Sequence, residues 1–121
     1  TKNITITNST INGSVVAAEN IENSLNSLQQ STVESEAKVL LKQLLNEIKD
    51  LNDKVPKSQA QAIEHMANRA DNLVIESKSK TPNKEWCQLS LKGIKEAAKS
   101  IGEIAKPILI IAEKLSQLLL G

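Results

Sequence analysis

Aliphatic residues recur at helical spacing over most of this chain, and no other feature of the sequence constrains the fold as strongly. From about residue 19 onward they return every three or four positions, as on one face of an amphipathic helix. The length of 121 residues fits one domain. The connections between the predicted helices are short. We therefore expect an all-α fold over 19–121, a bundle of three or four antiparallel helices.

The first predicted helix covers about 20–53 and carries the longest aliphatic stripe. Its spacing slips by one residue between Leu28 and Val33, and two interpretations remain open there. Thr32 can cap a new helix, or one long helix can run through the slip. We favour the single long helix.

Two more helices are predicted in the middle of the chain. Pro56 suits the start of a helix, and the aliphatic spacing behind it predicts one at about 57–77. The polar stretch over 78–83 predicts an exposed loop. Ser90 is a good N-cap for the next helix, at about 90–105.

Pro107 interrupts the helical pattern of the last third of the chain. Proline lacks a donor and clashes with the preceding turn, so we expect a kink or a break there and a final helix at about 107–120. This helix is apolar on nearly every side, which is typical of a helix in a core or at an interface. It is too short to span a bilayer, which takes about 20 apolar residues.

The first 18 residues are different, because they are rich in Thr, Asn, Ser, Ile and Val and carry a single charge. Alternation around Ile4 and Ile6 is typical of a strand, and Asn12-Gly13 is a strong signal for a hairpin turn. We therefore expect an N-terminal β-hairpin or β-arm over 1–18, with strands at about 3–11 and 14–18. It lies on the helices, joins a sheet of another domain, or pairs with copies of itself.

The residue counts make catalysis improbable. A single cysteine, Cys87, excludes an internal disulfide and multi-cysteine metal sites, and a single histidine, His65, excludes a His-pair zinc site. We expect Cys87 to be a buried structural thiol beside Trp86, and His65 to lie on the rim of another helix. No glycine-rich phosphate loop is present. We therefore predict no catalytic residues, no metal and no cofactor.

Charge is spread unevenly along the chain. Residues 1–53 hold 4 Lys and 7 acidic residues, whereas residues 54–121 hold 11 Lys plus Arg and 7 acidic residues. Nucleic-acid binders usually add arginines and stacking aromatics, and this chain has one of each, so nucleic acid is not an expected partner. Attraction between the acidic and basic halves is expected to help packing or assembly.

Three stretches carry a resemblance: INGSVVAAENIENS, AKVLLKQLLNEI and WCQLSLKGIKEAAKSIGEIAKPI. Together they resemble small helical domains appended to multidomain bacterial signalling and conflict-related proteins. The resemblance covers most of the chain and has no invariant motif. It implies a non-enzymatic accessory domain in a bacterial cytoplasm. The chain begins with Thr1 and shows no signal-peptide pattern, so we expect either a processed chain or a piece of a larger protein.

We therefore predict a non-enzymatic interaction or homo-oligomerisation module, whose partner is a copy of itself or another protein or domain. The alternative is a membrane-active helical effector whose C-terminal helices leave the bundle and insert. Two groups of residues are expected to carry the association, the first through strands and the second through the core or a helix interface. They are Ile4, Ile6, Ile11, Val15 and Val16, and Trp86, Ile108, Leu109, Ile111, Leu115 and Leu119.

Overall fold

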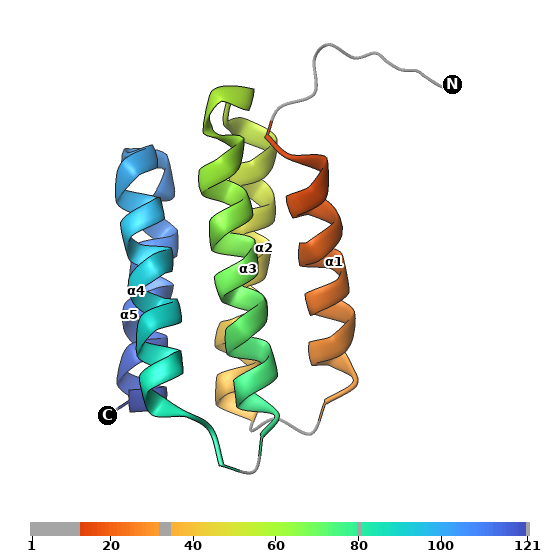
Figure 1. Cartoon of the computed structure of the whole chain (residues 1–121), viewed down its shortest axis with the longest axis vertical. Helices are drawn as coiled ribbons and strands as arrows, with labels where there is room; N and C mark the ends of the chain where they lie inside the picture. Colours follow the sequence, from red (N-terminus) through yellow and green to blue (C-terminus); the bar gives the residue numbers. More distant parts are fainter. Residues whose placement is uncertain (1–12, 32–34, 80, 121) are drawn as a thin grey trace.

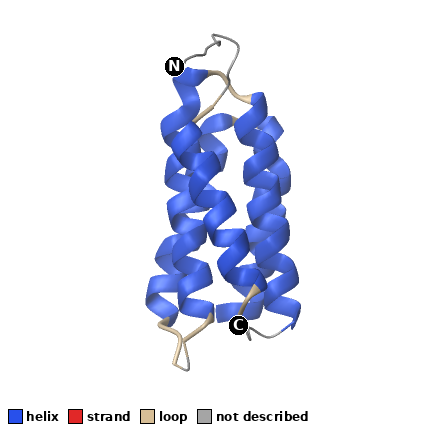
Figure 2. Cartoon of the chain, turned by 90° about the vertical axis from the view of Figure 1, so that its right-hand side faces the viewer, coloured by secondary structure: helices blue, strands red, loops and turns tan. Residues whose placement is uncertain are grey.

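A computed structural model of the chain describes residues 13–31, 35–79 and 81–120. Within these ranges all regular structure is helical and no strand is found (Figure 2). Short 3₁₀ turns precede the third and the fifth helix, at Lys57–Gln59 and Glu103–Ala105. The helices are α1 (Val15–Gln29), α2 (Ser35–Lys54), α3 (Ala60–Ser77), α4 (Lys84–Ile101) and α5 (Lys106–Leu120).

The five helices lie side by side along the long axis of the molecule, and the direction of the chain alternates from each helix to the next (Figure 1). Helices α2 to α5 form an antiparallel four-helix ring, in which α2 contacts α3, α3 contacts α4, α4 contacts α5, and α5 returns to α2. Helix α1 packs outside this ring, against α2 and α3. The expected all-α antiparallel bundle is therefore confirmed, with α1 as an additional helix.

The predicted aliphatic stripes form one continuous core that all five helices share. The i, i+3, i+4 spacing places the stripe of each helix on the side that faces its neighbours. Leu41, Leu44 and Ile48 of α2 are fully buried, and so are Ile21 of α1 and Leu115 of α5. The stripes therefore specify the inner faces of the helices, while the pairing of the helices closes the ring.

The predicted single helix over 20–53 is wrong, because α1 ends at Gln29 and α2 begins at Ser35. Ser31 helps to end α1, since its backbone N–H and its hydroxyl both donate to the Leu28 carbonyl, at 3.1 and 2.7 Å. The Leu28 carbonyl therefore has its hydrogen-bond partners although the helix does not continue. The break lets the stripes of α1 and α2 pack against each other as an antiparallel pair.

The predicted strand over 14–18 is also wrong, because these residues form the N-cap and first turn of α1. Ser14 is extended and its hydroxyl accepts from the backbone N–H of Ala17 at 3.0 Å, which is the usual N-cap bond. Gly13 has the positive φ expected of an Asn-Gly pair, +68°, but it leads into a helix. The N-terminal hairpin therefore finds no support, and its predicted strand over 3–11 lies outside the described residues.

Helix α4 begins at Lys84 and not at the predicted residue 90. Asn83 is its N-cap, and its side-chain oxygen accepts from the backbone N–H of Trp86 at 3.0 Å. Ser90 is therefore an interior helical residue, and it is buried. The break expected before Pro107 is found, because α4 ends at Ile101 and α5 begins at Lys106, which places Pro107 in the first turn of α5. The helix predicted over 57–77 agrees with the 3₁₀ turn and α3 together.

Candidate functional site

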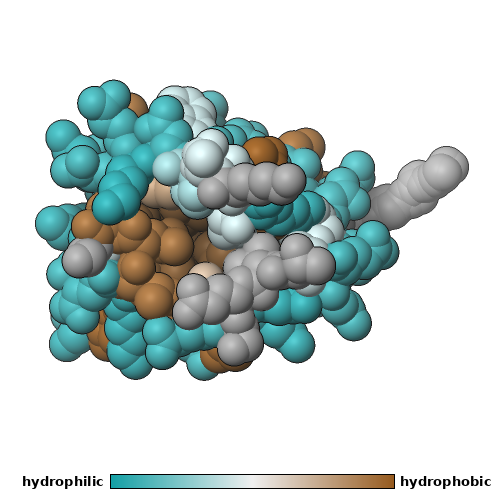
Figure 3. All heavy atoms as spheres, turned by 90° about the horizontal axis from the view of Figure 1, so that it is seen from below, coloured by the Kyte–Doolittle hydropathy of each residue, from teal (hydrophilic) through white to brown (hydrophobic). Residues whose placement is uncertain are grey.

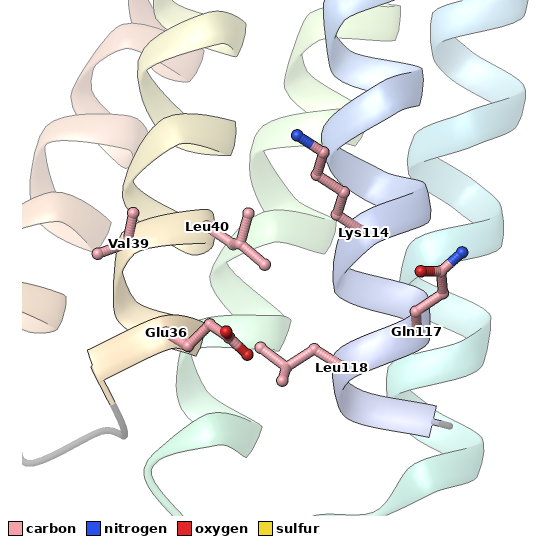
Figure 4. A pocket seen from close by; sticks show the side chains of 6 residues that line it. All are labelled: Glu36, Val39, Leu40, Lys114, Gln117 and Leu118. Carbon is pink, nitrogen blue, oxygen red and sulfur yellow. The ribbon is translucent and has the colours of Figure 1, made fainter.

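A groove of about 600 Å³ lies between α2 and α5. It lies at the end of the bundle where α2 begins and α5 ends (Figure 4). Seen from this end, hydrophobic side chains gather in a hollow with hydrophilic side chains along its outer edge (Figure 3). We call it the α2/α5 groove, and it is lined by Glu36, Val39 and Leu40 from α2 and by Lys114, Gln117 and Leu118 from α5.

Helical spacing places these six residues together. Residues three and four positions apart share one face of a helix, so the first turns of α2 and the last turns of α5 each present a short strip. Leu40 is half-buried and packs against the core, whereas Val39 is 54% exposed. Leu118 is half-buried from the α5 side. The groove therefore has an aliphatic lining that is open to solvent.

Two opposite charges mark the ends of the α2/α5 groove. The Glu36 carboxylate points toward Leu118, while the Lys114 ammonium lies toward the other end, with Leu40 between them (Figure 4). Both charged residues are exposed. Neither makes an ion pair within the described part of the chain, where the ion pairs join Lys49 to Glu22 and Lys95 to Glu113. Both charges are therefore open to groups that approach from outside.

A polar junction at the opposite end of the bundle fixes the start of α1. Asn52 of α2 is buried, and its side chain accepts from the Ser14 backbone N–H at 2.7 Å and donates to the Ser14 carbonyl at 2.9 Å. The Ser14 hydroxyl donates to Glu64 of α3 at 2.8 Å. The Gly13 N–H donates to the Val55 carbonyl at 3.0 Å. These bonds determine where the N-terminal segment meets the bundle.

The predicted association residues of the N-terminal segment have different outcomes. Val15 and Val16 lie in the first turn of α1 and are 65% and 59% exposed. They are therefore available to a partner, although on a helix and not on a strand. Ile4, Ile6 and Ile11 lie outside the described residues, so their role stays a prediction.

The residues predicted on α5 belong mostly to the core. Ile108, Ile111 and Leu115 are buried, and Leu109 and Leu119 are half-buried against the core cluster. Their packing agrees with the core alternative of the prediction and leaves little of their surface for a partner.

Trp86 lies in the first turn of α4 and is 39% exposed. This exposure argues against the core alternative predicted for Trp86, and its role at an interface stays a prediction.

The structure places Cys87 on α4 and His65 on the neighbouring helix α3. Cys87 is buried, and burial together with the negative charge of Glu76 raises the pKa of its thiol. His65 is exposed on α3, as expected. It lies beside Gly93 of α4, and among the described residues no hydrogen bond joins it to the Cys87 thiol. A Cβ at Gly93 would lie 3.2 Å from the His65 Nε2, so α3 and α4 approach closely here. Within the described ranges, no group of three or more His, Cys, Asp or Glu residues is placed to hold a metal ion.

The sequence reasoning missed the α2/α5 groove. Neither Glu36 nor Val39 was singled out from the sequence. The usable signal was Val39 itself, an aliphatic residue beside the buried stripe of its helix and therefore on a face turned partly toward solvent.

Comparison of the chain with known protein families, with curated proteins and with solved structures finds no significant match. The resemblance to bacterial accessory domains therefore stays a prediction. In the part of the chain that the structure describes, none of the helices has the length and apolar character needed to cross a membrane.

Proposed function

We propose that this chain is a non-enzymatic interaction module that associates with copies of itself through aliphatic side chains on the surface of its helical bundle. The α2/α5 groove carries this proposal, because Val39, Leu40 and Leu118 remain partly open to solvent beside a complete core. Full burial of an aliphatic side chain contributes roughly 1.5–3 kcal/mol. Half-buried side chains gain less than this, so the contact needs several of them from each of two surfaces.

The surroundings of the one cysteine support an interaction role over a catalytic one. A nucleophilic cysteine reacts as its thiolate, which requires a lowered pKa. Burial raises the pKa of Cys87, and Glu76 adds to this effect. The exposed surface instead offers aliphatic side chains on several helices, including Val15 and Val16 at the start of α1.

The setting of this module rests on the sequence resemblance alone. On that basis we place it in a larger bacterial protein of the cytoplasm, where it joins that protein to further copies or to another domain. A membrane-active role is the competing proposal, in which the helices would leave the bundle.

The experiment is multi-angle light scattering of the full chain over a concentration series from low to high micromolar. The weight-average mass should rise above the 13.2 kDa of one chain as the concentration increases. A mass of one chain at every concentration contradicts the proposal. If the monomer also makes anionic vesicles leak, the membrane-active role replaces it.

A further inference from the structure

We infer that two copies of this chain meet at the α2/α5 groove and form a symmetric homodimer, with Glu36 of each copy against Lys114 of the other. This inference rests on the proposed function and adds to it the surface, the stoichiometry and the orientation. The charges around the groove are arranged so that one groove is complementary to a second copy of itself.

The groove has an aliphatic centre and opposite charges at its two ends. Leu40 lies between Glu36 and Lys114, and Leu118 lies beside the Glu36 carboxylate (Figure 4). A two-fold axis can cross the groove midway between the two charges, at right angles to the line that joins them. Such an axis places each carboxylate opposite the ammonium of the other copy and brings the two aliphatic centres together. A two-fold contact must be self-complementary in this way.

The other three seams of the four-helix ring are already spanned by contacts within the chain. Helix α1 packs over the seam between α2 and α3. Arg69 and His65 lie against Gly93 across the seam between α3 and α4, each with a nitrogen 3.2 Å from the position of an added Cβ. The ion pair between Lys95 and Glu113, at 2.9 Å, spans the seam between α4 and α5. The seam between α2 and α5 holds the α2/α5 groove and has no such bridge among the described residues.

The ion pairs and the aliphatic contacts contribute differently to this dimer. Exposed ion pairs contribute little free energy because water and salt screen them. Burial of Val39, Leu40 and Leu118 therefore supplies most of the affinity. The charges select the orientation, because like charges brought face to face disfavour every other arrangement.

Charge reversal in the full chain tests the inference, with sedimentation equilibrium as the measurement. Glu36→Lys puts two lysines on each groove, and Lys114→Glu puts two glutamates on each groove. Each variant alone should raise the dimer dissociation constant roughly tenfold or more. An equimolar mixture of the two should recover dimers, because each groove then meets its complement. The double variant E36K/K114E should recover them within one chain.

Two controls separate this effect from general changes in charge or fold. Glu96→Lys makes the same charge reversal on α4, outside the groove, and should leave the dissociation constant unchanged. Circular dichroism should show the same helical content for every variant.

The outcomes distinguish this inference from the proposed function. If the parent chain associates and the single reversals do not weaken it, or if the mixture recovers no dimer, this interface is wrong while the proposed function stands. If the parent chain is monomeric at all concentrations, both are wrong.

Discussion

Asn52 holds the backbone of Ser14 by two hydrogen bonds, one to the N–H and one from the amide to the carbonyl. Both residues are buried, so water does not replace these bonds when they are lost. Gly13 is needed beside them, because a Cβ at this position would lie 2.1 Å from the Asn52 backbone oxygen. A single amide side chain therefore joins the start of α1 to the end of α2.

We predict that Asn52→Ala lowers the free energy of unfolding by about 2–4 kcal/mol, because two buried backbone groups of Ser14 lose their partner. Urea denaturation of both proteins measures the change. Asn46→Ala is the matched control, since Asn46 is exposed on the same helix. Equal losses for Asn52→Ala and Asn46→Ala would show that the junction does not stabilise the fold.

The thiol of Cys87 gives the stability a pH dependence of known sign. Burial raises its pKa in the folded chain above the ordinary value of 9.0. Above about pH 9 the unfolded chain has lost this proton while the folded chain keeps it, so the free energy of unfolding falls as the pH rises. The stabilisation is complete below the unfolded pKa and is lost through the folded pKa.

Cys87→Ala removes this titration, and comparison with the parent chain isolates it. The difference in urea midpoint between the two proteins should be constant from about pH 7 to about pH 8, and should move in favour of Cys87→Ala above about pH 9. A difference that stays constant up to about pH 10 would mean that the folded thiol titrates like an exposed one.

At the scale of the element, α1 differs from the other helices because it lies outside the four-helix ring. Its apolar face contributes Ile21 and Leu28 to the core. Its polar contacts include the bond from the Ser24 hydroxyl to Asp71 at 2.7 Å and the exposed ion pair of Glu22 with Lys49. How much each contact stabilises the fold depends on how far it is exposed to solvent.

We predict that Ile21→Ala destabilises the protein by about 2–5 kcal/mol, because it removes fully buried volume from the core. Glu22→Gln should leave the unfolding midpoint nearly unchanged, since the ion pair with Lys49 is exposed and screened. Thermal and urea unfolding of both variants measures this. A larger loss for Glu22→Gln than for Ile21→Ala would show that the ion pair holds α1 in place.

The aliphatic stripes predicted the helical class well, and they predicted the ends of the helices less well. The stripe behind Pro56 located α3, because a helix that faces a core on one side carries a clear period. The start of α4 was missed by six residues, since Lys84 and Glu85 are polar and add nothing to a stripe. The strand predicted over 14–18 rested on β-branched residues. Their preference for strands is weak, and here Ser14 caps a helix that includes them.

At the scale of the whole molecule, the α2/α5 groove exists because the first and last helices of the ring meet. Its two sides, around Val39 and around Leu118, lie far apart in the sequence. Local spacing predicts the inner face of each helix, but it does not state which helices become neighbours. The sequence patterns predicted contacts on the N-terminal segment, at Trp86 and on α5, and three of the five side chains chosen on α5 proved to be buried.

The dimer inferred at the groove makes thermal stability depend on concentration. A contact that forms only between folded chains stabilises them by mass action, so the Tm of the parent chain should rise with protein concentration. Val39→Asp places a charge at the α2 edge of the groove and should abolish this rise, while its Tm at high dilution stays close to that of the parent. Ile75→Asp is the matched control, because Ile75 on α3 is 55% exposed against 54% for Val39 and does not line the groove. Differential scanning calorimetry over the concentration series measures both variants. A rise in Tm that persists in Val39→Asp, or that is lost equally in Ile75→Asp, would place the dimer contact outside the groove.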